Sequence, residues 1–263
     1  MQEVGIKESL SYLLSKAVVR TYTTFAYPGL AAAHRVRYNY LWREIEQGYC
    51  EAEALRFVSS RVQKGQTVFD VGAWIGSYTI LFSKLVSNTG RVVAFEPDPR
   101  VFDVLCENLM MNAALNVTTR KMAVSDRSGR AILAAGRLGW SGASIVGYKR
   151  SNNLQTAFVE TITLDEFCDR ENMSPDWIKI DVEGAEGLVA DGMSRIVGTC
   201  HPKILLGFHG DMMSRADRTK AWSSITRLSN RVVFIQGDDE RLNNGDELAS
   251  EVPSCRLIAF LQY

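Results

Sequence analysis

Two carboxylates that could take part in proton transfer, Asp181 and Glu183, directly follow the apolar segment Trp177-Ile-Lys-Ile. Side chains alternate in direction along a strand, so the two acids point to the same side where the segment ends. Apolar neighbours would partly desolvate them and raise their basicity, which suits a proton acceptor. An acid here can instead stabilise the start of the next helix, and we favour that role for Glu186. The pattern predicts Asp181 and Glu183 as catalytic residues.

A glycine-containing loop, Asp70-Val-Gly72-Ala-Trp-Ile-Gly76, follows an earlier apolar segment. Gly72 and Gly76 allow a tight turn and the close approach of a ligand, and the next helix start offers unpaired N–H groups to an anion. A nicotinamide fingerprint would be G-x-G-x-x-G, but Trp74 stands two residues after Gly72. The spacing is similar to that of the S-adenosylmethionine loop of class I methyltransferases, although a tight turn without a ligand would look the same. The predicted cofactor-binding residues here are Asp70, Gly72, Ala73, Gly76, Ser77 and Tyr78. Asp181 is also predicted to contact the cofactor, because its strand end would face the methyl donor bound over Gly72.

A second acidic position, Glu96, ends the next apolar segment in the order Phe95-Glu-Pro-Asp-Pro99. A carboxylate at such a strand end can accept hydrogen bonds from both hydroxyls of a ribose. Pro97 stiffens the turn and removes an N–H donor. The alternative is that Glu96 only stabilises a helix start. We predict that Glu96 and Pro97 belong to the cofactor site.

His209 ends a later apolar segment, which the strand order would place beside the segment that ends at Asp181. Imidazole exchanges protons near neutral pH, so His209 is the third catalytic candidate, with a structural histidine as an equal alternative. Oxygen ligands such as Asp181 suit Mg²⁺, and the sequence leaves a metal requirement open.

Strands and helices alternate from Gln66 onward. This alternation predicts an α/β fold with a mostly parallel seven-stranded sheet and helices on both faces. The similarity of the glycine loop implies that this is the Rossmann-like class I methyltransferase fold. The apolar segments are continuous rather than alternating, as in strands buried on both faces. Strands are expected at 67–71, 91–95, 116–124, 177–181, 203–208, 231–235 and 255–261, helices at 78–86, 101–113, 185–197 and 216–228, and short extended pieces with loop at 129–164.

Residues 1–64 are predicted to form a helical cap or lid, and residues 65–263 the cofactor-binding domain. Apolar residues from Leu10 to Val18 recur at helical spacing, and further helices are expected at 30–47 and 53–62. The first helix could alternatively lie on a membrane surface. We expect the acceptor pocket to combine residues 136–144 with this segment, although the aromatic residues could equally be ordinary packing. The aromatic candidates are Tyr12, Tyr22, Tyr38, Tyr40, Trp42 and Trp140.

Composition excludes several classes of partner. The 263 residues carry 30 lysines and arginines against 30 aspartates and glutamates, so no net positive charge favours nucleic acid. Five dispersed cysteines without a C-x-x-C pair indicate reduced thiols and a cytoplasmic location. No apolar run approaches the roughly 20 residues of a membrane span, so no stable membrane anchor is expected. The oligomeric state stays open.

Several segments together resemble the FkbM family of methyltransferases, over roughly residues 49–211. The resemblance implies an S-adenosylmethionine-dependent O-methyltransferase that acts on hydroxyls of sugars or natural products. The segments, in the order of the family, are Phe69-Asp-Val-Gly-Ala-Trp-Ile-Gly76, Ala94-Phe-Glu-Pro-Asp-Pro99, Glu107-Asn-Leu109, Ala123-Val-Ser-Asp126, Thr163-Leu-Asp165 and Ile178-Lys-Ile-Asp-Val-Glu-Gly-Ala-Glu186.

The resemblance also assigns roles to individual residues. It implies that Asp70, Gly72 and Gly76 line the cofactor loop and that Glu96 holds the ribose. Ala123 and Val124 would border the adenine, with Ser125 and Asp126 nearby, and Asp181 and Glu183 would lie by the reacting centre. Trp74 stands where the family usually has asparagine, and Gly207 where an acid commonly precedes the histidine by two residues.

The predicted reaction is in-line displacement at the methyl carbon by a hydroxyl oxygen of a small molecule, with donor and acceptor held close and aligned. Asp181, Glu183 or His209 would remove the hydroxyl proton. Two alternatives are an S-adenosylmethionine-binding protein that has lost catalysis, which Gly207 makes conceivable, and a nicotinamide-dependent oxidoreductase, which Trp74 disfavours.

Overall fold

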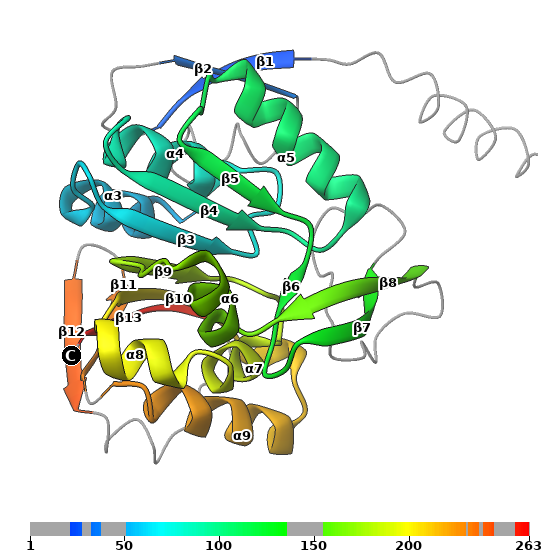
Figure 1. Cartoon of the computed structure of the whole chain (residues 1–263). Helices are drawn as coiled ribbons and strands as arrows, with labels where there is room; N and C mark the ends of the chain where they lie inside the picture. Colours follow the sequence, from blue (N-terminus) through cyan, green and yellow to red (C-terminus); the bar gives the residue numbers. More distant parts are fainter. Residues whose placement is uncertain are drawn as a thin grey trace, which may run out of the picture.

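An eight-stranded sheet forms the centre of the computed structural model (Figure 1), which describes residues 22–27, 33–37, 51–135, 155–229, 231–236, 239–244 and 256–262. In spatial order the strands are β12 (Asp239–Asn244), β11 (Arg231–Gln236), β13 (Arg256–Gln262), β10 (Lys203–His209), β9 (Trp177–Ile180), β3 (Thr67–Val71), β4 (Arg91–Phe95) and β5 (Val117–Arg120).

The sheet is mostly parallel, as predicted. β10, β9, β3, β4 and β5 pair in parallel, whereas β13 runs antiparallel to both β10 and β11. The predicted count of seven strands was one too low, because β12 pairs antiparallel with β11 at the edge of the sheet. The β12 sequence is polar and has no apolar run, and its main chain gains hydrogen bonds by pairing with the neighbouring strand.

Helices cover both faces of the sheet, and alternate strand residues supply the two cores. Val68 and Trp177 face α3 (Ala52–Arg61), α4 (Ser77–Val86) and α5 (Pro99–Met111). Phe69 and Ile178 face the opposite way, toward a second group of helices. Burial of both faces explains the continuous apolar runs of the central strands. The second group is α6 (Leu164–Glu171), α7 (Glu186–Asp191), α8 (Ser194–Cys200) and α9 (Arg215–Thr226).

Two predicted elements are broken in the structure. The expected strand 116–124 divides into β5 and β6 (Ala123–Val124), and β6 joins a separate sheet with β7 (Gly129–Ala135) and β8 (Gln155–Ile162). The expected helix 185–197 divides into α7 and α8 around Gly192. A Cβ at Gly192 would lie 2.0 Å from the carbonyl oxygen of Ser125, so the chain makes a close backbone contact there.

The N-terminal region contains a β-hairpin where a helix was predicted. β1 (Tyr22–Ala26) pairs antiparallel with β2 (Ala33–Arg37), which corrects the helix expected at 30–47. His34 and Val36 are buried, whereas Arg35 between them is exposed. This alternation is typical of a strand with one buried face, and β2 packs against α5. The first predicted helix, residues 38–50 and the predicted pocket segment 136–144 lie outside the described residues. The expected helix at 53–62 is α3.

The described part of the chain contains no helix that is long and apolar enough to cross a membrane.

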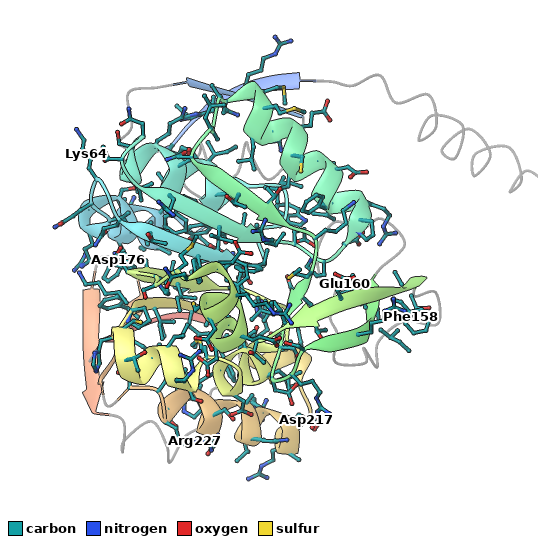
Figure 2. All side chains as sticks on the ribbon, in the orientation of Figure 1. Lys64, Phe158, Glu160, Asp176, Asp217 and Arg227 are labelled. Atoms are coloured by element: carbon teal, nitrogen blue, oxygen red, sulfur yellow. The ribbon has the colours of Figure 1, made fainter. Side chains whose placement is uncertain are left out.

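The small sheet carries an apolar pair on its outer side, because Ile132 lies opposite Phe158, whose side chain projects from β8 (Figure 2). The division at residue 64 stays a prediction, although α3 shares the core of the larger unit through contact of Phe57 with Phe260.

Candidate active site

The loop after β3 lies directly against the end of β9. Gly72 has φ +79°, and a Cβ on it would lie 1.9 Å from the carbonyl oxygen of Asp181. The Asp181 N–H donates to the carbonyl of Val71 at 3.0 Å. Only glycine fits this position, because both the backbone conformation and the space exclude a side chain. The glycine loop and the acidic segment therefore meet at one edge of the sheet, as predicted from the sequence.

Trp74 adopts a left-handed backbone conformation, with φ +49°. Asparagine tolerates this conformation better than most residues, which gives a physical reason for the asparagine that the FkbM resemblance leads one to expect there. The indole Nε1 of Trp74 is buried and has no hydrogen-bond partner among the described residues. The loop thus holds a buried donor that the described residues leave unsatisfied.

Glu96 is a buried carboxylate at the end of β4. Its Oε2 accepts the Trp74 N–H at 2.9 Å, and its Oε1 accepts the Asp98 N–H at 2.8 Å. Burial raises the pKa of Glu96 to about 7, and the two backbone hydrogen bonds only partly offset this effect. Each oxygen of an ionised carboxylate accepts more than one hydrogen bond, so Glu96 retains capacity for further donors.

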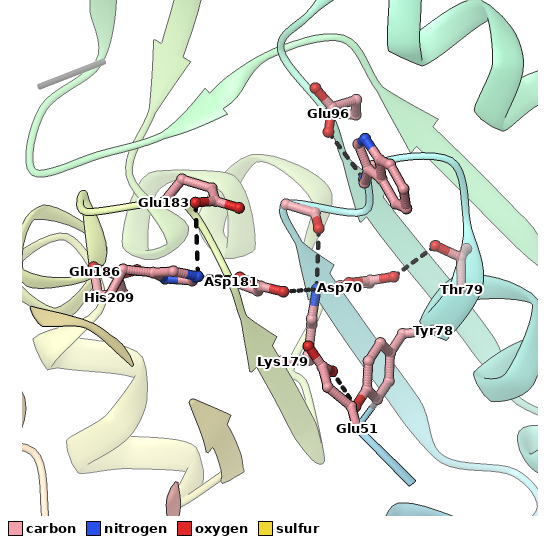
Figure 3. Close-up of polar contacts among 12 residues, drawn as sticks. Glu51, Asp70, Tyr78, Thr79, Glu96, Lys179, Asp181, Glu183, Glu186 and His209 are labelled. Atoms are coloured by element: carbon pink, nitrogen blue, oxygen red, sulfur yellow. Dashed lines mark hydrogen bonds and ion pairs between the residues drawn. The ribbon is translucent and has the colours of Figure 1, made fainter. Parts of the chain in front are cut away.

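A buried lysine that the sequence argument did not select, Lys179, joins the loop to the acids (Figure 3). Its Nζ donates to the carbonyl of Gly72 at 3.0 Å and lies 3.4 Å from both Asp70 and Asp181. Burial lowers the pKa of Lys179, but the charges of Asp181, Asp70 and Glu51 more than offset this and raise it above its ordinary value. A lysine inside an apolar strand was the sequence signal for this ion pair.

Asp70 is fixed from a second side, because Thr79 of α4 donates to its Oδ2 at 2.6 Å. Glu51, just before α3, accepts a hydrogen bond from the hydroxyl of Tyr78 at 2.8 Å. Burial is the main cause that raises the pKa of Glu51, followed by the charge of Asp181, and Lys179 partly opposes both. No sequence pattern indicated Glu51, which reaches the site from the region predicted to be a separate cap.

The three predicted catalytic residues lie together at the ends of β9 and β10. The Nε2 of His209 lies 3.4 Å from Oδ1 of Asp181 and 3.7 Å from Oε2 of Glu183 (Figure 3). Its Nδ1 makes a 2.6 Å hydrogen bond with Oε1 of Glu186. Glu186 also accepts the Gly184 N–H at 3.1 Å, so the acid assigned to the helix start orients the histidine as well.

The charges around His209 determine its protonation. Burial lowers the pKa of His209, but the hydrogen bond with Glu186 and the charges of Asp181, Glu186 and Glu183 outweigh burial and raise it to about 9. With no other cation bound, the ring is therefore an imidazolium at neutral pH and has no free lone pair. In that state the proton acceptors of the group are Asp181 and Glu183.

Gly207 lies beside Asp181, as the pairing of β10 with β9 requires. A Cβ at Gly207 would lie 3.4 Å from Cγ and Oδ1 of Asp181. An acid at position 207 would therefore enter the site next to Asp181.

The remaining predicted cofactor residues, Ala123 and Val124, form β6 and are buried. The N–H of Glu96 donates to the carbonyl of Arg120 at 3.1 Å, so the segment leading to β6 starts beside Glu96. The next residue, Ser125, hydrogen-bonds to Asp126 at 3.1 Å. Contact of these residues with an adenine stays a prediction.

The family model described as the methyltransferase FkbM domain matches residues 70–231 of this chain. The chain belongs to the FkbM methyltransferase family. The match spans the glycine loop, Glu96, the acidic segment and His209, and it confirms the family that the sequence segments resemble. This FkbM protein is a methyltransferase enzyme with a Rossmann-like fold, and the nicotinamide alternative no longer holds.

Two known proteins are similar to this chain, one in sequence and one in fold. The chain is 26% identical over 203 residues to the hexuronic acid methyltransferase AglP of Haloferax volcanii, covering 75% of this chain and 80% of the relative. The crystal structure of methyltransferase FkbM from Methylobacillus flagellatus matches with a TM-score of 0.52 and 16% identity over 80% of this chain. The chain spans 47% of that crystallised protein, and the likeness concerns the fold.

Proposed function

We propose that this methyltransferase uses S-adenosylmethionine to methylate a hydroxyl group of a small molecule, with a sugar of the hexuronic acid type as the first acceptor to test. One observation carries the proposal: the glycine loop that would hold the cofactor touches the segment that bears the acids, through Gly72 and Asp181. The name of the Haloferax relative supports the acceptor class.

The residues of the loop fit an adenosyl cofactor. Glu96 has spare acceptor capacity for two ribose hydroxyls, and the buried Nε1 of Trp74 offers a donor. Asp70, held by Thr79 and Lys179, supplies a fixed negative charge close to the turn. When bound, S-adenosylmethionine supplies an electrophilic methyl group attached to a positively charged sulfur.

The acids next to the loop suit a hydroxyl acceptor. A hydroxyl is a poor nucleophile until its proton is being removed, and Asp181 and Glu183 are the nearby acceptors for that proton. His209 holds both carboxylates in place through its Nε2. An acceptor that is already an anion would need no such base, so the paired acids favour a hydroxyl over a carboxylate.

The overall charge of the chain supports a small acceptor. Its formal net charge is zero, which provides no general attraction for a polyanion such as RNA. Cys106, Cys168 and Cys200 are free thiols, which supports a reducing compartment such as the cytoplasm.

The test is a transfer assay with S-adenosylmethionine labelled in its methyl group. We expect label in D-glucuronic acid or a glucuronoside and little in total RNA, and we expect the label to resist mild alkali because it is an ether. Label found only in RNA, or released by alkali as from an ester, would contradict the proposed acceptor.

Loss of the proton acceptor is the matched mutational test. Asp181→Asn should lower kcat by about 10²- to 10⁴-fold, the usual contribution of general base catalysis. Asp103→Asn is the control, because Asp103 is exposed on α5 and pairs only loosely with Lys121, at 3.6 Å. Equal activity of both variants would remove Asp181 from the mechanism.

A further inference from the structure

Asp181, Glu183 and His209 present three different side chains whose ligand atoms converge on one point. One atom from each of the three residues lies within 4.8 Å of the others. Donor atoms that share one ion at about 2.1 Å and at about 90–110° lie about 3.0–3.4 Å apart. The distances from His209 Nε2, 3.4 Å to Asp181 and 3.7 Å to Glu183, are close to that spacing.

The histidine is oriented as a metal ligand is. Its side chain is 8% exposed, and the hydrogen bond from Nδ1 to the fully buried Glu186 fixes the ring so that Nε2 points between the two acids. Metal-binding histidines characteristically hold their second ring nitrogen in such a bond to a carboxylate. The 3.4 and 3.7 Å contacts of Nε2 are ion pairs that are longer than ordinary hydrogen bonds.

The surrounding charges also fit a divalent cation. Lys179 contacts Oδ2 of Asp181, whereas Oδ1 faces His209, so an ion bound beside the imidazole would meet Oδ1. Three carboxylates converge on the imidazole, one of them completely buried. The side chains of Asp181 and Glu183 are 28% and 18% exposed, which leaves a side open to solvent and to an acceptor.

We propose that Asp181, Glu183 and His209 bind one divalent transition-metal ion, with Mn²⁺ or Zn²⁺ preferred over Mg²⁺. Carboxylates alone suit Mg²⁺, but an imidazole nitrogen in the ligand set favours a first-row transition metal. Three protein ligands with an open position are typical of catalytic metal sites. The ion would act as a Lewis acid on the acceptor hydroxyl, whose proton would pass to the carboxylate oxygen of Glu183 that does not bind the ion, and this role, unlike the binding itself, rests on the proposed function.

The experiment is direct metal binding to the full chain after dialysis against a chelator. Titration with Mn²⁺, followed by the EPR signal of the free ion, should show one site per chain, and Mg²⁺ should compete at least about 10-fold less well. No saturable Mn²⁺ site on the folded wild-type chain would overturn the inference. If Mg²⁺ displaces Mn²⁺ when the two ions are at equal concentration, the preference for a transition metal is overturned.

Variants separate this site from adventitious binding. His209→Asn and Glu183→Gln should abolish the Mn²⁺ site, and Glu186→Gln should weaken it about 10- to 100-fold by releasing the imidazole. His201→Asn is the matched control, because His201 lies at the end of α8, outside the cluster. Unchanged Mn²⁺ binding in His209→Asn, or an equal loss in His201→Asn, would contradict the assignment.

Two further measurements keep the outcomes distinguishable. Circular dichroism melting without metal verifies that each variant is folded, and Glu183→Gln keeps the test valid if a buried variant does not fold, because Glu183 is partly exposed and the change preserves its size. Calorimetry with S-adenosylhomocysteine on the same samples tests the cofactor. Cofactor binding without metal binding refutes this inference alone, whereas metal binding without cofactor binding refutes the proposed function.

Discussion

At the scale of single residues, Glu96 shows how burial prepares a carboxylate for a ligand. Its pKa of about 7 lies above the ordinary 4.5, so the folded protein favours the protonated form. The stability that this group contributes is fully present below about pH 4.5 and is lost as the pH rises through about 7. Hydrogen bonds from ligand hydroxyls would stabilise the ionised form of Glu96, which burial disfavours in the protein without a ligand.

A pH dependence of nucleoside binding follows from this property. An ionised Glu96 accepts two hydroxyl hydrogen bonds, so affinity for 5′-methylthioadenosine should rise as the pH increases through about 7 and then level off. This probe lacks the titrating amino acid part of the cofactor. Calorimetry between pH 5.5 and 8.5, a range of about three units around that pKa, is the measurement, and Glu96→Gln should be weaker and flat. A flat profile in the wild type would exclude Glu96 as the titrating contact.

Lys179 is a residue whose removal should be costly for stability. Lys179→Met would leave Asp70 and Asp181 without their shared counter-ion and should reduce the free energy of unfolding by about 3–5 kcal/mol. Lys121→Met, which breaks an exposed pair with Asp103, should cost at most about 1 kcal/mol. Urea denaturation of both variants measures the difference, and similar losses would show that the buried network does not hold the loop.

At the scale of elements, the turn between β3 and α4 depends on one glycine. Gly72→Ala should reduce the stability by more than about 3 kcal/mol, because the new Cβ would overlap the Asp181 carbonyl at a left-handed position. Gly198→Ala in α8 is the control, since its added Cβ would meet no atom of another described element within 4 Å, and it should stabilise by about 0.5–1 kcal/mol. Thermal melting that ranks the two variants in the opposite order would contradict the backbone contact.

Some strands could be predicted from the sequence and others could not. β3 and β4 begin and end at the predicted residues, because short apolar runs buried on both faces leave a strong local signal. Residues 33–37 were predicted as part of a helix, since their strand pairing depends on β1 and on packing against α5. β12 was not predicted because its sequence is polar and lacks the periodic apolar residues from which strands are recognised.

Some residues of the candidate site could be recognised from local sequence patterns, whereas others are brought there only by the tertiary structure. Asp181, Glu183 and His209 were predicted together because they stand at the ends of two recognisable strands, and the carboxyl ends of neighbouring parallel strands lie side by side. Lys179 was overlooked because a lysine within a strand has no obvious role until the register places it beside Asp70. Glu51 approaches from outside the family match, and no spacing rule connects it to Tyr78.

At the scale of the whole molecule, the polar site lies on one face of the sheet, at the carboxyl ends of the central strands β3, β9 and β10. Asp70 pairs with Lys179 in the register of β3 and β9, and Asp181 continues the same face toward the strand ends. The N-terminal hairpin is tied to this side through two contacts. Tyr27 donates to the carbonyl of Ser77 at the start of α4, and Asn112 donates to the carbonyl of Arg35 at 2.9 Å. The hairpin is therefore attached next to α4 and α5, the helices that follow β3 and β4.

We predict that the loop after β3 and the acid at the end of β4 together bind an adenosyl cofactor. Isothermal titration of the purified chain with S-adenosylhomocysteine tests it most directly. We predict one saturable site per chain, weakened at least about 10-fold in Glu96→Gln, because hydrogen bonds to a charged group contribute about 1.5–3 kcal/mol. Absence of binding by both S-adenosylhomocysteine and S-adenosylmethionine to the folded wild-type chain would contradict the account.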